Sequence, residues 1–187
     1  IGLNHAEGMV MVKAAREHGV VLMEAFMYRC HPQTAKLVEL IRSGVLGTVG
    51  LVQAAFSFNS GYNASSRFWA NDAGGGGILD VGCYTVSMAR LVAGAAAGTP
   101  FLDPVAVTGA GVLHPESGVD VQATAILKFE NNVIAQVSTG VGLTQDNVVR
   151  IYGTDGWLLI PSPWVINRDG GPSKLLLHKA GASAPEE

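Results

Sequence analysis

Charged residues, cysteines and long apolar runs are all scarce in this sequence of 187 residues. Lys, Arg, Asp and Glu make up 14% of the chain, and its formal net charge is -3. Because the Lys and Arg residues are scattered, no basic face for nucleic acid is predicted. The longest strongly apolar stretch, Val20–Met27, is interrupted by Glu24, whereas a membrane span needs about twenty apolar residues. Neither a nucleic-acid partner nor a membrane is therefore expected.

Cysteine is limited to Cys30 and Cys83, which form no CxxC pair and have no His-rich ligand set beside them. The two residues predict neither a disulfide framework nor a metal site, and both are expected to be small buried hydrophobes. No charged segment followed by an apolar one opens the sequence, so no secretory signal is recognised. These features favour a reduced, cytoplasmic setting.

Hydrophobic residues, in contrast, make up 48% of the chain, and glycine is frequent with 24 residues. This length supports one domain with a substantial core. Low charge combined with high apolar content also predicts that part of the surface is covered by another subunit or domain.

The first thirty residues predict half of a βαβ unit. Asn4 and Glu7 have the spacing of a helix N-cap and its partner, and Gly19 is a suitable stop for that helix. Val20–Phe26 follows as a short apolar strand, which in a parallel sheet is hidden on both faces. Such a unit needs further strands before it, and the tail from Gly181 is rich in Ala, Pro and Ser. Both ends are therefore expected to be truncations.

The middle of the chain is predicted to mix helices and strands. Pro32 suits the first turn of a helix, and Thr48–Phe58 alternates with the period of a strand. After an irregular aromatic segment, Asn59–Asp72, a second helix is expected over Ile78–Ala93, with Gly94 as its stop.

Most of the remaining sequence alternates with period two, which predicts strands with one apolar face. The predicted strands are Val119–Phe129, Val133–Thr139, Asn147–Tyr152 and Trp157–Ile160. Tight turns such as Asn131-Asn132 join them into an antiparallel meander. The predicted fold class is α+β, with an open, mostly antiparallel sheet that carries its helices on one face.

The other face of that sheet is predicted to be uncharged. Its residues are Gln122, Thr124, Ile126, Ile134, Gln136 and Ser138. A flat face with few long charged side chains suits stacking against a second copy, so a homodimer through the sheet face is expected. The alternative is an ordinary solvated face that happens to be poor in charge.

Two segments could carry chemistry. Gly74–Gly77 precedes the second predicted helix, where glycines would leave free N–H groups at the positive end of the helix dipole. Asp80 and Tyr84 are four residues apart, share a predicted helix face and could act on one bound molecule, with the Tyr84 phenolate favoured by the dipole. The alternatives are a flexible glycine loop, a capping Asp and a core Tyr.

The second segment is EAFMYRCHPQ, residues 24–33, at the carboxyl end of the predicted parallel strand. Ligands of open α/β sheets bind beyond this end of the strands, which makes Arg29 and His31 candidates for cofactor binding. The alternatives are a surface cation for Arg29 and a helix N-cap for His31.

With EAFMYRCHPQ and GGGGILDVGCY about forty residues apart, the sequence resembles the glucose–fructose oxidoreductase / inositol dehydrogenase (Gfo/Idh/MocA) family from Ile1 to about Ile160. It is most similar to the branch of dihydrodiol and D-xylose dehydrogenases. The resemblance implies that residues 1–28 are the remnant of a dinucleotide-binding Rossmann domain. Residues 29–187 would then form the C-terminal substrate-binding and oligomerisation domain, incomplete at its C-terminus.

The resemblance also implies roles for individual residues. Tyr84 matches the family's catalytic tyrosine and Asp80 the pocket aspartate, while Arg29 falls near the nicotinamide. Arg67 and Trp69 lie in the loop that shapes the sugar site. The implied reaction is hydride transfer between a sugar or diol and NAD or NADP, with Tyr84 taking the proton.

The family's catalytic lysine lies in a Glu-Lys-Pro motif upstream of Asn4, and neither this motif nor the glycine-rich phosphate fingerprint is in the chain. The chain alone is therefore expected to bind no NAD(P) and to be inactive. A non-catalytic carbohydrate-binding or scaffold module is the alternative function, and the presence of Asp80, Tyr84 and Arg29 favours the enzyme. The particular sugar or diol, and the choice between NAD and NADP, stay open.

Overall fold

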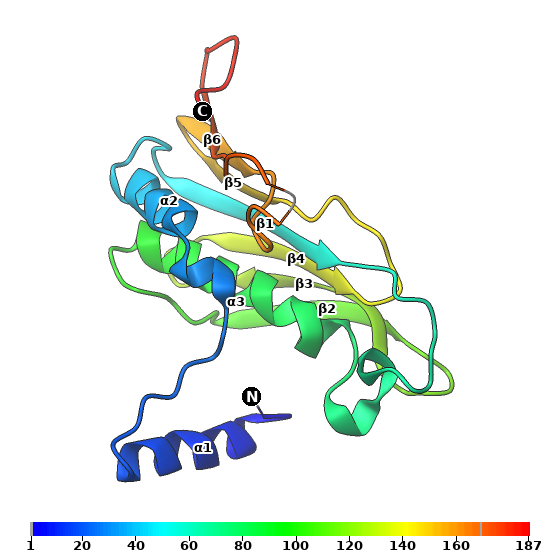
Figure 1. Ribbon diagram of the computed structural model, residues 1–187. Coiled ribbons are helices and arrows are strands. Elements are labelled where there is room, and N and C mark those ends of the chain that lie inside the picture. The colour runs from blue at the N-terminus through cyan, green and yellow to red at the C-terminus, as the bar shows by residue number, and fades with distance from the viewer. Residues whose placement is uncertain (1, 169) are drawn as a thin grey trace.

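A single mixed sheet organises the computed structural model, which describes residues 2–168 and 170–187 (Figure 1). Within these residues the helices are α1 (His5–Glu17), α2 (Pro32–Arg42) and α3 (Cys83–Ala96), with a π-helical turn, η4 (Ile78–Gly82), directly before α3. The strands are β1 (Val49–Ser57), β2 (Ala106–Leu113), β3 (Asp120–Lys128), β4 (Ile134–Gly140), β5 (Val149–Gly153), β6 (Gly156–Ile160) and β7 (Leu176–Lys179). The predicted α+β class is confirmed.

The strand order is β2-β3-β4-β1-β5-β6-β7. The β1–β4 pair is parallel and the other neighbours are antiparallel, which confirms a mostly antiparallel sheet. The predicted simple meander is wrong at one point, because β1 is inserted between β4 and β5. A period-two pattern shows which side chains share a face but not which strand lies beside which.

The core lies between one face of the sheet and the helices α2 and α3, while the opposite face carries no helix (Figure 1). Leu37 of α2 and Met88 and Val92 of α3 are buried, as are Val52 of β1 and Ile151 of β5. Each such side chain contributes about 1.5–3 kcal/mol by leaving water. The segment Asn71–Ala96 is long and apolar enough to cross a membrane by composition, and 56% of its most apolar window is buried within the protein, as in a core helix.

The strand predicted at Val20–Phe26 is not formed. Residues 20–26 form an irregular segment without a sheet partner among the described strands, and Val21 is 95% exposed. A strand needs neighbouring N–H and C=O groups, and none of the described strands supplies them. The segment joins the body to α1, which has no buried residue and stands apart from the sheet (Figure 1). The predicted cap of α1 is confirmed, since Asn4 Oδ1 accepts from the Glu7 N–H at 3.1 Å.

The predicted stop at Gly94 is also wrong, because α3 continues through it to Ala96. The backbone of Phe101 crosses Gly94 so closely that no Cβ could fit there. Gly94 is therefore explained by close packing, and Gly98, with φ of 73°, follows the helix end.

Candidate active site

The glycine run Gly74–Gly77 forms a tight connection with little free backbone. The Gly75 N–H donates to Ala70 O at 2.8 Å and the Gly76 N–H to Phe68 O at 2.9 Å. The Ile78 N–H donates to a carboxylate oxygen of Asp120 at 2.7 Å. The expectation of free N–H groups at this helix start is therefore wrong, because the protein's own acceptors occupy these three.

Close packing requires glycine at these positions. A Cβ on Gly75 would lie 2.7–2.8 Å from the carbonyl oxygens of Arg67, Phe68 and Ala70, and one on Gly77 would lie 2.8 Å from the Cα of Gly140. Gly74 and Gly76 also have φ values of 72° and 102°, which other residues rarely adopt. The run is thus a tightly packed connection, called the glycine joint below, that brings the next turn, η4, into close contact with the sheet.

Tyr84 follows this joint and is half-buried among aromatic rings. Its ring meets Phe26 edge-on at 4.9 Å and Phe56 at 5.4 Å between centroids, and Tyr28 and Trp164 lie at 6.0 and 6.2 Å. These four residues form the aromatic cage. Offset and edge-on contacts of this kind each stabilise by about 0.5–1.5 kcal/mol beyond their buried area, so the cage fixes the phenol.

Hydrogen bonds hold the cage itself in place. The Tyr28 hydroxyl donates to Ser87 Oγ at 2.9 Å, and the Trp164 indole N–H donates to Ala55 O at 2.7 Å. The Tyr84 hydroxyl contacts the thioether sulfur of Met27 at 3.7 Å. A thioether is a weak acceptor, so the phenol retains most of its capacity for a stronger partner.

The pKa of Tyr84 is raised above its ordinary value, first by burial and then by the electrostatic effects of the neighbouring Cys83, Asp80 and Glu24 side chains. The expectation that the helix dipole favours the phenolate is therefore wrong for this chain, because desolvation and neighbouring anions both oppose the charged form. At neutral pH Tyr84 carries its proton.

Asp80 lies on η4 and is paired with Arg67. The guanidinium Nη1 is 2.6 Å from Asp80 Oδ1, and the Asp80 side chain is 10% exposed against 68% for Arg67. Arg67 also stacks over the Phe68 ring at 4.3 Å from its centroid. The structure thus pairs Arg67 with Asp80 and places the Asp80 carboxylate near enough to Tyr84 to raise the pKa of its phenol, so these residues singled out from the sequence are linked through Asp80.

The other sequence candidates have different surroundings. Trp69 is buried in a small second cluster, where its indole N–H donates to Ser60 Oγ at 3.0 Å. His31 caps α2, with its ring Nδ1 accepting from the Gln33 N–H at 3.1 Å, so the alternative interpretation of His31 is confirmed. Arg29 is exposed and lines a concavity of about 460 Å³ together with Glu24 and Phe26.

The cysteines behave differently from one another. Cys30 is exposed, so its expected burial is wrong, because it lies on the outer side of the 3-10 helix Met27–Cys30. Cys83 is partly buried, and burial raises the pKa of its thiol to about 11, which leaves it a neutral and unreactive group. Among the described residues no group of three or more His, Cys, Asp or Glu could hold a metal ion.

Sequence reasoning missed the aromatic cage and Asp120. Phe26 and Tyr28 lie within EAFMYRCHPQ, where their aromatic character is the available signal. The sequence pattern assigns Phe56 only to the face of a strand, and Trp164 lies in an irregular segment without any pattern. Nothing in the spacing connects Asp120 with Ile78, which is 42 residues away.

Comparison with known proteins gives a consistent picture. The sequence model of the protein family described as the GFO/IDH/MocA C-terminal domain matches residues 34–159. The chain is 39% identical over 140 residues to the D-xylose 1-dehydrogenase (NADP(+)) 2 of Haloferax volcanii, covering 75% of the chain and 40% of that protein. It is 31% identical over 164 residues to the trans-1,2-dihydrobenzene-1,2-diol dehydrogenase of Mus musculus, covering 88% of the chain and 46% of that protein. The chain therefore spans somewhat less than half the length of these two relatives.

Solved structures share the fold. An aldose-aldose oxidoreductase from Caulobacter crescentus complexed with glycerol superposes with a TM-score of 0.80 at 24% identity, over 100% of this chain and 53% of that one. A 3-ketoreductase from Actinomadura kijaniata in complex with NADP and TDP-benzene gives a TM-score of 0.78 at 22% identity, over 95% of this chain and 52% of that one.

Proposed function

The chain belongs to the Gfo/Idh/MocA family of oxidoreductases, and we propose that it forms the substrate side of an NAD(P)-dependent enzyme acting on a sugar or diol. The observation that carries the proposal is Tyr84, a neutral phenol held by the aromatic cage, whose pKa is raised in part by the Asp80 carboxylate of the Asp80–Arg67 ion pair. A positioned phenol next to a hydrogen-bonding carboxylate can exchange a proton with a substrate hydroxyl or carbonyl oxygen.

Each side chain has a part in this proposal. Tyr84 exchanges the proton, and the Asp80 carboxylate accepts a hydrogen bond from a substrate hydroxyl, which fixes its orientation. Arg67 holds the Asp80 carboxylate in place through the ion pair at 2.6 Å. Because the pKa of Tyr84 is raised, this chain alone favours the protonated phenol, which donates to a carbonyl oxygen in the direction of reduction. For alcohol oxidation, a cation near the phenol would have to favour its phenolate, and the family's lysine upstream of Asn4 is the expected source.

The surroundings of Arg29 fit a nicotinamide cofactor. The apolar segment 20–26 is exposed, with Val21 at 95% and Met23 at 66%, as expected of a segment that packs against a dinucleotide-binding domain. We assign residues 1–28 to that domain and residues 29–187 to the substrate domain. Arg29 and Arg90 supply positive charge to the adjoining concavity. NAD(P), when bound, would supply the hydride acceptor or donor.

The test is Tyr84→Phe in the full-length protein that contains this chain. The change removes one hydroxyl and leaves the aromatic packing, so kcat should fall about 10²–10⁴-fold while NADPH affinity stays within about twofold. Tyr152→Phe is the matched control, because its hydroxyl donates to Gln53 on the opposite face of the sheet. A Tyr84→Phe enzyme with parental kcat would show that another group carries the proton. No activity in the parental protein on any sugar or diol would favour a carbohydrate-binding or scaffold role.

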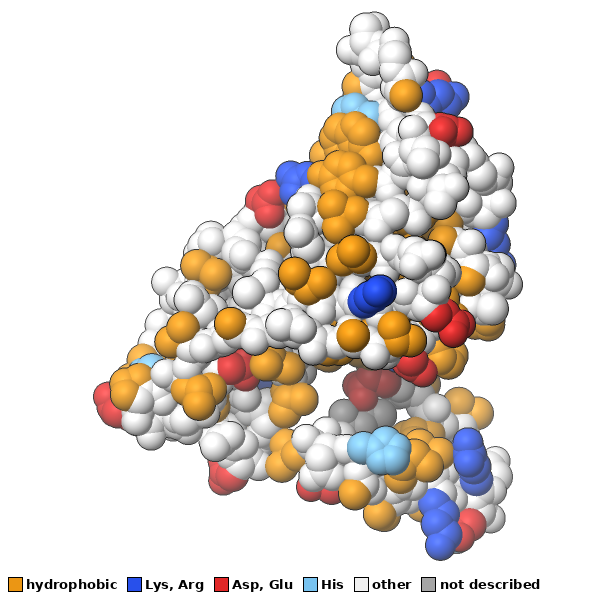
Figure 2. Space-filling model, turned by 180° about the vertical axis from the view of Figure 1, so that it is seen from behind, with side chains coloured by type: hydrophobic (Ala, Val, Ile, Leu, Met, Phe, Trp, Pro, Cys, Tyr) orange, Lys and Arg blue, Asp and Glu red, His pale blue; other side chains and the backbone are white. Residues whose placement is uncertain are grey.

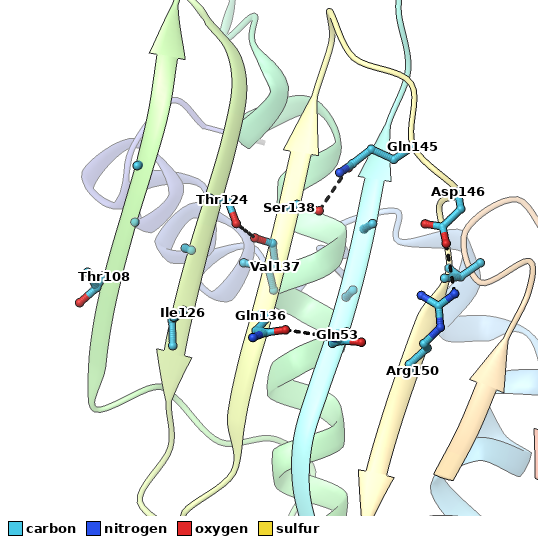
Figure 3. A pocket seen from close by; sticks show the side chains of 16 residues that line it. Gln53, Thr108, Thr124, Ile126, Gln136, Val137, Ser138, Gln145, Asp146 and Arg150 are labelled. Atoms are coloured by element: carbon cyan, nitrogen blue, oxygen red, sulfur yellow. Dashed lines mark hydrogen bonds and ion pairs between the residues drawn. The ribbon is translucent and has the colours of Figure 1, made fainter. Parts of the chain in front are cut away.

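The helix-free face of the sheet supports a second proposal, that the protein is a homodimer through this face. The face is hollowed into a shallow concavity of about 630 Å³, which is lined by uncharged residues apart from the ion pair between Asp146 and Arg150, and few charged side chains lie on the face seen from behind (Figure 2). Its polar side chains bond to their own neighbours: Gln53 to Gln136 at 2.7 Å, and Ser138 to Gln145 at 3.2 Å (Figure 3). Side chains already ordered in this way lose less conformational entropy on association.

A further inference from the structure

Asp120 lies at the start of β3 and binds the turn that carries Asp80. Its Oδ2 accepts from the Ile78 N–H at 2.7 Å, the first residue of η4. Its Oδ1 lies against Gly76, where any Cβ would collide with the carboxylate. Burial raises the pKa of the Asp120 carboxyl, and the backbone N–H groups of Ile78, Asp120 and Gly77 counteract this effect. These backbone N–H groups therefore compensate part of the cost of burying the Asp120 carboxylate, which ties its position to the turn.

Thr139 of β4 supplies a second attachment for the same turn. Its hydroxyl donates to Gly77 O at 2.8 Å, and its methyl carbon lies 3.0 Å from the position of a Cβ on Gly82. Thr139 is buried, so this bond is shielded from water. The turn Ile78–Gly82 is thus hydrogen-bonded to the sheet at its N-terminal end and packed against Thr139 at Gly82.

The consequence concerns the geometry of the site. The turn has π-helical hydrogen bonding. This form occurs mostly as single turns within α-helices, is frequent at functional sites and leaves the backbone less regular than an α-helix. Asp80 is in the turn and Tyr84 is two residues beyond it. Their position relative to the aromatic cage therefore depends on what holds the turn. A carboxylate at the N-terminal end of a helix is also favoured by the helix dipole.

We propose that Asp120 is a positioning residue for the Asp80–Tyr84 site, acting as a fixed acceptor on β3 that sets the height of η4 above the sheet, with Thr139 as its partner on β4. This inference rests on the proposed function of Tyr84. Asp120 does not touch the substrate; it acts through the backbone of Gly76–Ile78. A simple helix cap would contribute stability alone, whereas a positioning residue changes the chemical step.

The experiment compares Asp120→Ala with Asp120→Asn in the full-length protein. Asparagine has the same shape and keeps one acceptor oxygen for the Ile78 N–H, whereas alanine removes both oxygens. Displacing a catalytic group by about 1 Å costs on the order of 10²-fold in rate, so Asp120→Ala should lower kcat about 10²-fold with NADPH affinity within twofold. Asp120→Asn should recover kcat to within about fivefold of the parent. Hydrogen exchange of the Ile78 amide should quicken about tenfold or more in the alanine variant alone.

A control variant and a second test variant accompany Asp120→Ala. Asp155→Ala removes a carboxylate in the β5–β6 turn that accepts from Thr154, and it should leave kcat unchanged. If Asp120→Ala does not fold, Thr139→Val tests the second attachment and should lower kcat about 5–20-fold with a normal fold.

Parental kcat in a folded Asp120→Ala protein overturns the inference, as does an equal loss of kcat in Asp120→Asn. If Tyr84→Phe is also fully active, the proposed function fails; if Tyr84→Phe is inactive and Asp120→Ala is active, only the positioning role fails.

Discussion

The substitution Gly75→Ala measures how tightly the glycine joint is packed. Gly75 has no positive φ, so alanine is acceptable to the backbone and only the space for one methyl group is tested. That space is closed by three carbonyl oxygens at 2.7–2.8 Å, those of Arg67, Phe68 and Ala70. Backbone atoms cannot rotate away as the end of a side chain could, so the loop carrying Arg67 must move.

The expected cost follows from three contributions. Forcing an extra methyl group into a packed site costs about 1–3 kcal/mol. The bonds Gly75 N–H to Ala70 O and Gly76 N–H to Phe68 O lie within the strained turn, and weakening them adds about 1 kcal/mol. Replacing glycine recovers about 0.4–1 kcal/mol by restricting the unfolded chain. The net loss of unfolding free energy is about 1–3.5 kcal/mol, or about 2–14 °C in Tm for a chain of this size.

Urea and thermal unfolding followed by circular dichroism would measure this loss. Gly50→Ala is the matched control, because Gly50 lies in β1, has no positive φ and has no other atom within 4 Å of the place that a Cβ would take. It should be neutral or stabilise by up to about 1 kcal/mol. If Gly75→Ala and Gly50→Ala unfold within about 0.5 kcal/mol of each other, the joint is looser than the structure shows.

Two further predictions concern the sheet face and the thiol. Thr124→Lys with Gln136→Lys places like charges in the middle of the proposed interface and should give a monomer; a double variant that still elutes as a dimer in size exclusion with light scattering excludes this face. Burial raises the pKa of Cys83 from 9.0 to about 11, so its contribution to stability is complete below pH 9 and is lost as the pH rises toward 11. A rise of about two pK units at about 1.4 kcal/mol each gives an upper limit of about 3 kcal/mol, which partial exposure of the thiol reduces to about 1 kcal/mol. Cys83→Ala should remove this loss of stability. An unchanged pH dependence of the urea midpoint in that variant would contradict the assignment of the loss to Cys83.

The elements whose signals are local could be predicted from the sequence. Pro32 begins α2 with His31 as its cap, and Asn132, with φ of 64°, forms the hairpin turn between β3 and β4. The alternation in β3 correctly predicted that Ala123, Ala125 and Leu127 are less exposed than the residues between them, but it was wrong for Asp120, whose carboxylate binds Ile78 on the helix side of the sheet. These features depend on capping, turn conformation and period, which a few neighbouring residues determine.

Features that depend on neighbours distant in the sequence required the structure. Val20–Phe26 has the composition of a strand, but strand formation needs a partner that no described strand provides. Gly94 has the pattern of a helix stop, but the reason for this glycine is that the backbone of Phe101 crosses it. The sequence does not show that crossing.

The sequence by itself determined the fold class and the two motifs, and it predicts Asp80 and Tyr84 as the centre of a site. Only the tertiary structure decided that β1 enters between β4 and β5, and that Arg67 pairs with Asp80. It also decided that Tyr84 is neutral, because its pKa depends on burial and on charges brought close by folding. Residue types fix what a group can do, whereas distance and exclusion of water fix which state it takes.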